Sequence, residues 1–150
     1  MTNKDITIII TSFRSDAKIE SCLKSINQEI KVLVIENSNN KELKDKIENK
    51  YSNVKCFLSD KNLGYAKGNN IGLKMVETKY CIILNPDAEL YDNTIENFLL
   101  TAKKNPNFAI IGPYIQEDTD VSKKVLNKNS LIEVNNLKGF ALFLNMKEFL

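Results

Sequence analysis

The residues of this chain that could carry chemistry fall in four short groups, and each group follows a run of apolar residues. Hydroxyls, amides, glycines, two aromatic rings, a lysine, a guanidinium and two carboxylates occur in the groups Thr11-Ser12-Phe13-Arg14, Glu36-Asn37, Asn62 to Gly72, and Asn85-Pro86-Asp87. The chain contains no histidine. That absence excludes histidine general bases, serine or cysteine nucleophiles activated by histidine, and histidine-ligated zinc. Any chemistry must therefore use carboxylates, amides, hydroxyls, lysine, arginine or a bound cation.

Strands are predicted directly before these groups. The nearly continuous apolar run at 6–11 indicates a strand that is buried on both faces, as in a parallel sheet. Further strands are predicted at 32–35, 54–58, 80–84, 108–111 and 140–144. Weaker strand patterns lie at 121–126 and 131–134.

Helices are predicted between the strands. Apolar residues recur at helical spacing after the first strand, where Ser15 or Asp16 can cap the helix, and after the second, where Asn40 can cap it. A third helix starts in the glycine-rich segment and is expected to end near Glu77 or Thr78. Alternating strands and helices predict an α/β fold with right-handed crossovers and helices on both faces of a parallel sheet.

In such a fold the four groups meet at one rim of the sheet, because ligands of parallel sheets bind outside the carboxyl ends of the strands. The mixture suits a nucleoside diphosphate. Glu36 is placed to accept hydrogen bonds from ribose hydroxyls or a base N–H, with a solvated strand-end carboxylate as the alternative. Phe13 could support a base or cover the core.

The glycine-rich group suits phosphates or sugar hydroxyls. Asn62, Gly64 and Asn69 surround a helix start, where glycine leaves room and the helix N-terminus attracts anions. Ordinary turn and cap chemistry is the alternative, but it would not need the further glycines at 68 and 72.

Asn85-Pro86-Asp87 also has two interpretations. Asparagine followed by proline is typical of a type I turn. An oxygen-rich turn after a buried strand can also hold Mg²⁺ or Mn²⁺ through Asp87, which would neutralise a diphosphate leaving group. One carboxylate makes a weak metal site that substrate phosphates must complete.

The four groups together resemble family 2 glycosyltransferases, especially the rhamnosyltransferase-like branch. The resemblance covers residues 5 to about 145, and its motifs are Ile-Thr-Ser-Phe-Arg, Val-Ile-Glu-Asn-Ser, Asn-Leu-Gly-Tyr-Ala-Lys-Gly-Asn-Asn-Ile-Gly-Leu and Leu-Asn-Pro-Asp-Ala-Glu. It implies a GT-A fold, a three-layer sandwich with a mostly parallel central sheet. It also implies inverting transfer of a sugar from a UDP- or dTDP-sugar to a hydroxyl of a glycan or lipid-linked acceptor, in polysaccharide synthesis, with Mg²⁺ or Mn²⁺.

The resemblance carries roles onto single residues of the first three groups. Thr11, Ser12 and Arg14 would border the base and ribose, and Glu36 stands where the family usually has aspartate. Asn37 lies beside it at the same rim. In the glycine-rich group, the donor contacts would come from Asn62, Gly64 and Asn69.

The last group and the segment after it take the remaining roles. Asn85-Pro86-Asp87 occupies the place of the Asp-x-Asp motif, with asparagine for the first acid and Asp87 as the metal ligand. A glycine-containing strand near residue 139 resembles the one that precedes the acceptor side. We therefore expect one domain, with 1–112 as donor-binding core and 113–150 as the start of the acceptor side. The catalytic base is expected beyond Leu150.

The composition of the chain indicates its partners and its cellular location. Lysine and arginine number 21 against 19 acids, interspersed, so the net charge of +2 predicts no nucleic-acid partner. Three separate cysteines in apolar segments indicate buried thiols in a reducing compartment. No segment resembles a signal peptide or a membrane span, which predicts a cytoplasmic location; attachment to the inner membrane face through a partner stays open.

Two alternatives bear on function. Phe149-Leu150 leaves apolar side chains without cover, which favours pairing with another chain, and a homo-oligomer is one form of it. The GT-A domain is also expected to be truncated at its C-terminus, before the catalytic base, and this motivates the second hypothesis, a non-catalytic module that binds nucleotide-sugar or oligomerises. A dinucleotide oxidoreductase or nucleotidyltransferase is disfavoured, since the first turn lacks a glycine-rich phosphate loop.

Overall fold

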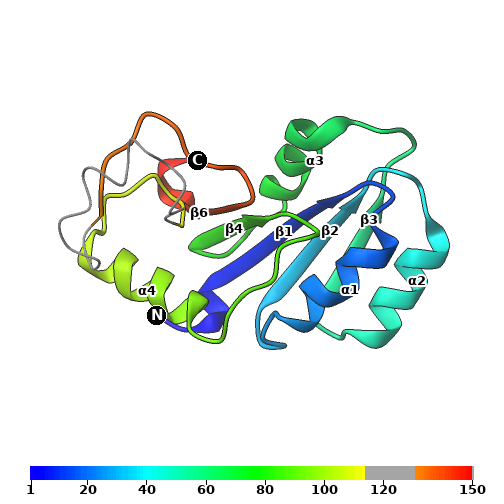
Figure 1. Ribbon diagram of the computed structural model, residues 1–150, viewed down its shortest axis with the longest axis horizontal. Coiled ribbons are helices and arrows are strands. Elements are labelled where there is room, and N and C mark those ends of the chain that lie inside the picture. The colour runs from blue at the N-terminus through cyan, green and yellow to red at the C-terminus, as the bar shows by residue number, and fades with distance from the viewer. Residues whose placement is uncertain (114–130, 150) are drawn as a thin grey trace.

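The computed structural model describes residues 1–113 and 131–149, and they form a three-layer α/β sandwich (Figure 1). The sheet of this described part has six strands in the order β3-β2-β1-β4-β6-β5. Its strands are β1 (Ile6–Ser12), β2 (Lys31–Glu36), β3 (Val54–Leu58), β4 (Tyr80–Leu84), β5 (Ile110–Ile111) and β6 (Ala141–Asn145). The first four are parallel to one another, while β6 runs antiparallel between β4 and β5. The predicted mostly parallel α/β fold is confirmed.

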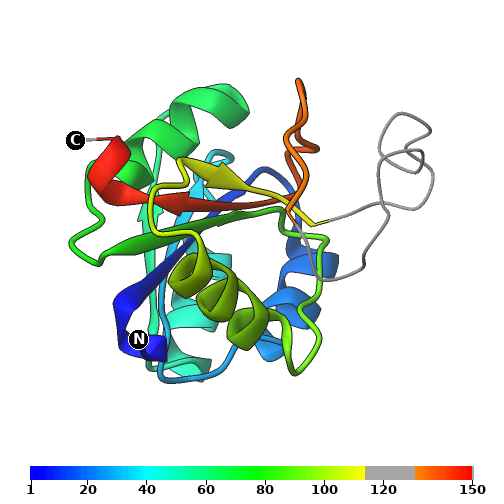
Figure 2. The same ribbon diagram turned by 90° about the vertical axis from the view of Figure 1, so that its left-hand side faces the viewer.

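Four α-helices of the described residues cover the two faces of the sheet. They are α1 (Asp16–Lys24), α2 (Lys41–Lys50), α3 (Gly64–Leu73) and α4 (Thr94–Lys104), with short 3₁₀ turns at Asn3–Asp5 and Met146–Glu148. One core cluster joins α1, α2 and α4 to one face, and a second joins the α3 segment to the other. Figure 2 shows the sheet between these two helical layers.

The apolar run of β1 is continuous because both faces of the strand are buried. Ile8 and Ile10 belong to the core cluster under α1 and α2, whereas Ile9 belongs to the cluster under α3. All seven residues of β1 are buried. Successive side chains of a strand point to opposite faces, so a strand with helices on both sides needs apolar residues at nearly every position.

Helix α3 lies very close to β1 because two of its glycines face the sheet. A Cβ added at Gly68 would lie 2.5 Å from Cγ2 of Thr11, and one added at Gly72 would lie 2.6 Å from Cγ2 of Ile9. Residues four apart share a helix face, so the two glycines form one flat strip. Gly68 and Gly72 therefore have a packing role that the sequence analysis did not foresee.

Helix starts agree with the predictions better than helix ends. The Asn40 side chain accepts a hydrogen bond from the Leu43 amide at 2.9 Å and caps α2 as expected. Ser15 holds the cap position of α1, but its hydroxyl donates to the Phe13 carbonyl instead. Helix α3 ends at Leu73, four or five residues before the predicted end near Glu77 or Thr78, because the chain must turn there to enter β4.

Strand predictions outside the central sheet were less accurate. The fifth strand shrinks from 108–111 to Ile110–Ile111, and 131–134 forms no strand. The predicted strand at 140–144 is confirmed as β6, shifted by one residue. The pattern at 121–126 lies outside the described residues. Within the described part of the chain, no helix has the length and apolarity needed to cross a bilayer.

Candidate functional site

The carboxyl ends of β1 and β2 bring three predicted site residues side by side. Ser12 and Glu36 are register partners on the two strands, and the Asn37 amide donates to the Ser12 carbonyl at 2.8 Å. All three side chains are buried. The parallel pairing of β1 with β2 thus brings Ser12 together with Glu36 and Asn37, which lie 24 and 25 positions after it in the sequence.

This group contains oxygens without hydrogen-bond partners. Oε1 of Glu36 accepts from the Ser38 amide at 2.7 Å and from the Ser38 hydroxyl. Glu36 Oε2, Ser12 Oγ and Asn37 Oδ1 are buried and have no partner in the described structure. Burying polar atoms without partners is costly. Such a concentration at the expected ligand edge indicates acceptors that a bound molecule would satisfy.

The start of α3 is tied to the same edge. Thr11 Oγ1 donates to Asn69 Oδ1 at 2.7 Å, and the Asn37 side-chain amide donates to the Gly64 carbonyl at 3.3 Å. Asn62 Oδ1 accepts from the Gly64 amide at 2.9 Å, where Gly64 has a φ of +75°. These contacts place Asn62, Gly64 and Asn69 as supports of the helix entry.

An open cleft of about 390 Å³ lies at the carboxyl ends of β1 and β4. It is lined by Arg14, Ser15, Ala17, Lys18, Tyr65, Asn85, Pro86 and Asp87. The cleft therefore joins the end of β1, the first turn of α1, the start of α3 and the end of β4. Of the predicted residues it includes Arg14, Asn85 and Asp87. The other predicted residues do not line it, namely Thr11, Ser12, Phe13, Glu36, Asn37, Asn62, Gly64 and Asn69.

Arg14 and Phe13 turn sharply out of β1. Arg14 has a φ of +51°, a left-handed conformation that is uncommon for a residue with a side chain. Its guanidinium carbon lies 5.2 Å from the centroid of the Phe13 ring, which is 43% exposed. Strained backbone of this kind often occurs at functional sites. An exposed Phe13 ring does not cover the core, so this alternative is not supported, and base support by Phe13 stays a prediction.

The Asn85-Pro86-Asp87 segment is a tight turn, as its sequence predicted. The Ala88 amide donates to the Asn85 carbonyl at 3.1 Å, and the Asn85 amide donates to the Phe140 carbonyl of the neighbouring chain segment at 2.9 Å. The Cys22 thiol also donates to the Asn85 carbonyl, at 3.6 Å. Burial, together with the charges of Asp87 and Glu89, raises the pKa of Cys22 to about 12, so the thiol keeps its proton.

The turn offers few ligands to a cation. Asp87 is half exposed and lies 3.7 Å from Lys18 Nζ, while Asn85 Oδ1 is buried without a partner. The described residues contain no group of three acidic, cysteine or histidine side chains that could hold a metal by themselves. One carboxylate and one amide oxygen can bind a divalent cation only weakly, and ligand phosphates must complete a tight site, since Mg²⁺ usually relies on substrate oxygens.

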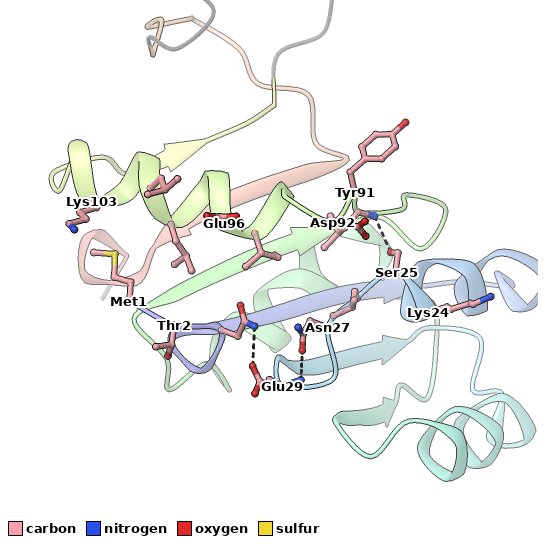
Figure 3. Close-up of a pocket in the computed structure, with 16 residues that line it drawn as sticks. Met1, Thr2, Lys24, Ser25, Asn27, Glu29, Tyr91, Asp92, Glu96 and Lys103 are labelled. Carbon is pink, nitrogen blue, oxygen red and sulfur yellow. Dashed lines mark hydrogen bonds between the residues drawn. The ribbon is translucent and has the colours of Figure 1, made fainter.

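A larger hollow lies elsewhere. It has a volume of about 810 Å³ and lies between α4, the connection from α1 to β2, and the N-terminal residues (Figure 3). Met1 to Asn3 precede β1, and Lys24 to Glu29 precede β2, so this hollow is at the amino ends of the strands. It contains none of the predicted site residues. Ligands of parallel sheets bind at the opposite edge.

Comparison with known proteins agrees with this geometry. The sequence model of Glycosyl transferase family 2 matches residues 7–148. The chain belongs to glycosyltransferase family 2. The low-salt glycan biosynthesis hexosyltransferase Agl10 of Haloferax volcanii is 29% identical over 115 residues, which cover 74% of this chain and 36% of the relative. This family 2 chain thus spans about a third or less of the curated relatives that it matches.

Solved structures show the same fold. A mannosyltransferase from Pyrobaculum calidifontis in complex with GDP-Man and Mn²⁺ aligns with a TM-score of 0.79 at 12% identity, covering 94% of this chain and 44% of that one. S. aureus TarS 1-349 in complex with UDP-GlcNAc aligns with a TM-score of 0.58 at 22% identity, covering 67% of this chain and 32% of that one. The GT-A fold predicted for this glycosyltransferase chain is confirmed.

Three residues near the predicted ones were not predicted from the sequence. Lys18 and Tyr65 line the cleft, and the Cys22 thiol donates a hydrogen bond to the Asn85 carbonyl in the turn. The Tyr65 hydroxyl donates to the Gly139 carbonyl and so connects α3 to the segment before β6. The spacing of Lys18 and Cys22 on one helix face was a usable signal, but only the fold shows what that face meets.

Proposed function

We propose that this chain forms the donor-binding part of a glycosyltransferase that uses a UDP- or dTDP-sugar. The observation that carries this proposal is the group of buried, unpartnered oxygens on Ser12, Glu36 and Asn37, at the same carboxyl edge of the sheet as the cleft that contains Asp87. The acceptors suit the N–H and O–H groups of a nucleoside, and the cleft suits its diphosphate. In the proposed division, residues 1–112 bind the donor and 113–150 begin the acceptor side.

The hydrogen bonds that Glu36 already accepts favour a pyrimidine base in the donor. One of its oxygens already accepts twice from Ser38, which leaves only Oε2 free. Uracil and thymine present a single ring N–H, which one free oxygen can accept. Guanine presents two adjacent N–H donors and pairs best with a carboxylate that has both oxygens free. We therefore expect UDP or dTDP to bind more tightly than GDP.

Asp87 and Asn85 would hold Mg²⁺ or Mn²⁺ together with the donor phosphates. The cation supplies charge neutralisation for the diphosphate as it leaves. Arg14 at the cleft wall adds a permanent positive charge on the same side. In the proposed reaction, an acceptor hydroxyl of a glycan or lipid-linked molecule attacks the anomeric carbon with inversion while the bond to the diphosphate breaks. The rhamnosyltransferase-like branch remains a prediction.

Calorimetric titration of UDP, dTDP and GDP, each with and without Mn²⁺, tests the donor proposal. Wild type is compared with Asp87→Ala and with Asp92→Ala, an exposed acid that lines the other hollow. We expect Mn²⁺-dependent binding of UDP or dTDP that only Asp87→Ala abolishes. Absence of nucleotide binding in every condition would refute the donor site, and GDP binding as tight as UDP binding would refute the role given to Glu36.

A further inference from the structure

Helix α1 contacts the turn that carries Asp87 at three points along one face. Lys18 Nζ lies 3.7 Å from Asp87 Oδ2, the Cys22 thiol donates to the Asn85 carbonyl, and Ser25 Oγ accepts from the Leu90 amide at 2.9 Å. Residues spaced by four and three positions share a helix face. The helix therefore contacts the beginning, the middle and the end of the turn.

Two of these three contacts already fix the turn. The Cys22 and Ser25 contacts are part-buried, and Asn85 is further held by its backbone bonds to Ala88 and Phe140. The third contact is different, because the Lys18 and Asp87 side chains are 68% and 52% exposed. Exposed ion pairs at such distances stabilise proteins little. The Lys18–Asp87 pair therefore adds little to the stability of the turn, and both side chains are free to take other partners.

The charges of the cleft point to a ligand. Its lining contains two cations, Arg14 and Lys18, and one anion, Asp87, so the net charge is two minus one, or +1. A divalent cation that approaches Asp87 must first displace the Lys18 ammonium, since like charges repel at one carboxylate. Once displaced, the ammonium stays at the cleft wall on a flexible four-carbon stem, within the space where phosphates would lie.

We propose that Lys18 is a diphosphate-binding residue that neutralises Asp87 when the donor is absent. With cation and donor bound, Asp87 would hold the cation and the Lys18 ammonium would pair with phosphate oxygens. This inference rests on the donor site proposed above. Lys18 then has two opposite effects on binding. It weakens the binding of the cation alone, because it competes for Asp87, and it strengthens the binding of the diphosphate together with the cation.

The opposite signs make the proposal testable by binding alone. Lys18→Met keeps most of the stem and removes the charge. Lys24→Met removes a charge from the same helix, at an exposed position that lines the other hollow (Figure 3). Affinity for Mn²⁺ alone is measured by the paramagnetic resonance signal of free Mn²⁺. Affinity for UDP at saturating Mn²⁺ is measured by calorimetry.

For Lys18→Met we expect Mn²⁺ alone to bind roughly two- to fivefold more tightly, because an exposed competing ion pair is lost. We expect UDP with Mn²⁺ to bind about tenfold more weakly, because one charge-assisted contact is lost. Lys18→Arg should restore most of the UDP affinity, and Lys24→Met should change neither value.

Each other outcome is decisive. If Lys24→Met gives the same shifts, a general loss of positive charge explains them and the proposal for Lys18 fails. If wild type binds UDP but Lys18→Met binds it equally well, the proposal for Lys18 fails while the donor site stands. If wild type binds no nucleotide with Mn²⁺, both are overturned.

Discussion

Gly68 holds α3 against the donor edge of the sheet, and its replacement by alanine tests that arrangement. The new Cβ would lie 2.5 Å from Thr11 Cγ2, 2.9 Å from Thr11 Oγ1 and 3.3 Å from the Asn37 side-chain nitrogen. Thr11 cannot simply rotate away, because Oγ1 donates to Asn69 at 2.7 Å and the threonine is buried. Either the helix moves or Thr11 gives up its hydrogen bond.

The magnitude follows from three effects. Overpacking by one methyl group costs about 1–3 kcal/mol, and we apply this range to Gly68→Ala. A lost hydrogen bond adds about 1 kcal/mol. Alanine is the better helix former by about 1 kcal/mol, which offsets part of the cost. We expect Gly68→Ala to lower the free energy of unfolding by about 1–3 kcal/mol. That is a large share of the roughly 5–15 kcal/mol available to a small domain.

Gly72→Ala is the matched control. Its Cβ would meet Ile9 at 2.6 Å, deep under the same helix, without touching Thr11 or Asn37. Urea unfolding gives the stability of both variants, and calorimetry with UDP and Mn²⁺ gives their binding. Both variants should lose stability, but only Gly68→Ala should lose nucleotide affinity beyond its loss of folded protein. A Gly68→Ala variant more stable than wild type by the helix-propensity gain alone would refute the close packing.

Three further predictions concern other parts of the fold. Hydrogen bonds from the Cys56 amide and Lys44 lower the pKa of Glu48 below its ordinary value of 4.5. This carboxylate therefore stabilises the fold above pH 4.5, and the contribution is lost as the pH falls through the lowered pKa. Glu48→Gln should make the free energy of unfolding, measured by circular dichroism, less dependent on pH in the acid range. Phe143 is fully buried and its ring lies 4.9–5.3 Å from three aromatic rings, so Phe143→Ala should cost about 3–5 kcal/mol in urea unfolding. Burial raises the pKa of all three cysteine thiols to about 12, so they should react with a disulfide reagent at pH 8 only as fast as the protein unfolds.

Glu48 also shows how the open edge of the sheet is protected. The Cys56 amide donates to Glu48 Oε1 at 2.7 Å, and Lys44 Nζ donates to the Cys56 carbonyl at 2.6 Å. Cys56 is on β3, the last strand on that side. Two side chains of α2 thus occupy backbone groups that a further strand would otherwise pair with.

Much of the donor edge could be predicted from the sequence because its signals are local. Apolar runs mark the buried strands, and the residues directly after them must lie at the carboxyl edge of a parallel sheet. This placed Ser12, Glu36 and Asn85 correctly at one rim. The Asn40 cap was predictable for the same reason, since its partner is only three residues away.

Predictions failed where an element depends on distant partners. The pattern at 131–134 resembles a strand, but a strand needs a neighbour with free backbone groups, and this segment has none in the described sheet. Leu131 is 46% exposed, so its apolar side chain is not in the core. Helix α3 was predicted too long because helical propensity does not record where the chain must turn back toward β4.

The sequence by itself determined the order of strands and helices, the polar groups that end the strands, and the family to which the chain belongs. Only the tertiary structure decided which groups meet. The glycines at 68 and 72 gained a packing role from the short distance between α3 and β1, and Lys18 met Asp87 across 69 positions of sequence. Such contacts depend on register and on the spacing between layers. Both are set by the packing of the whole core, and no local pattern records them.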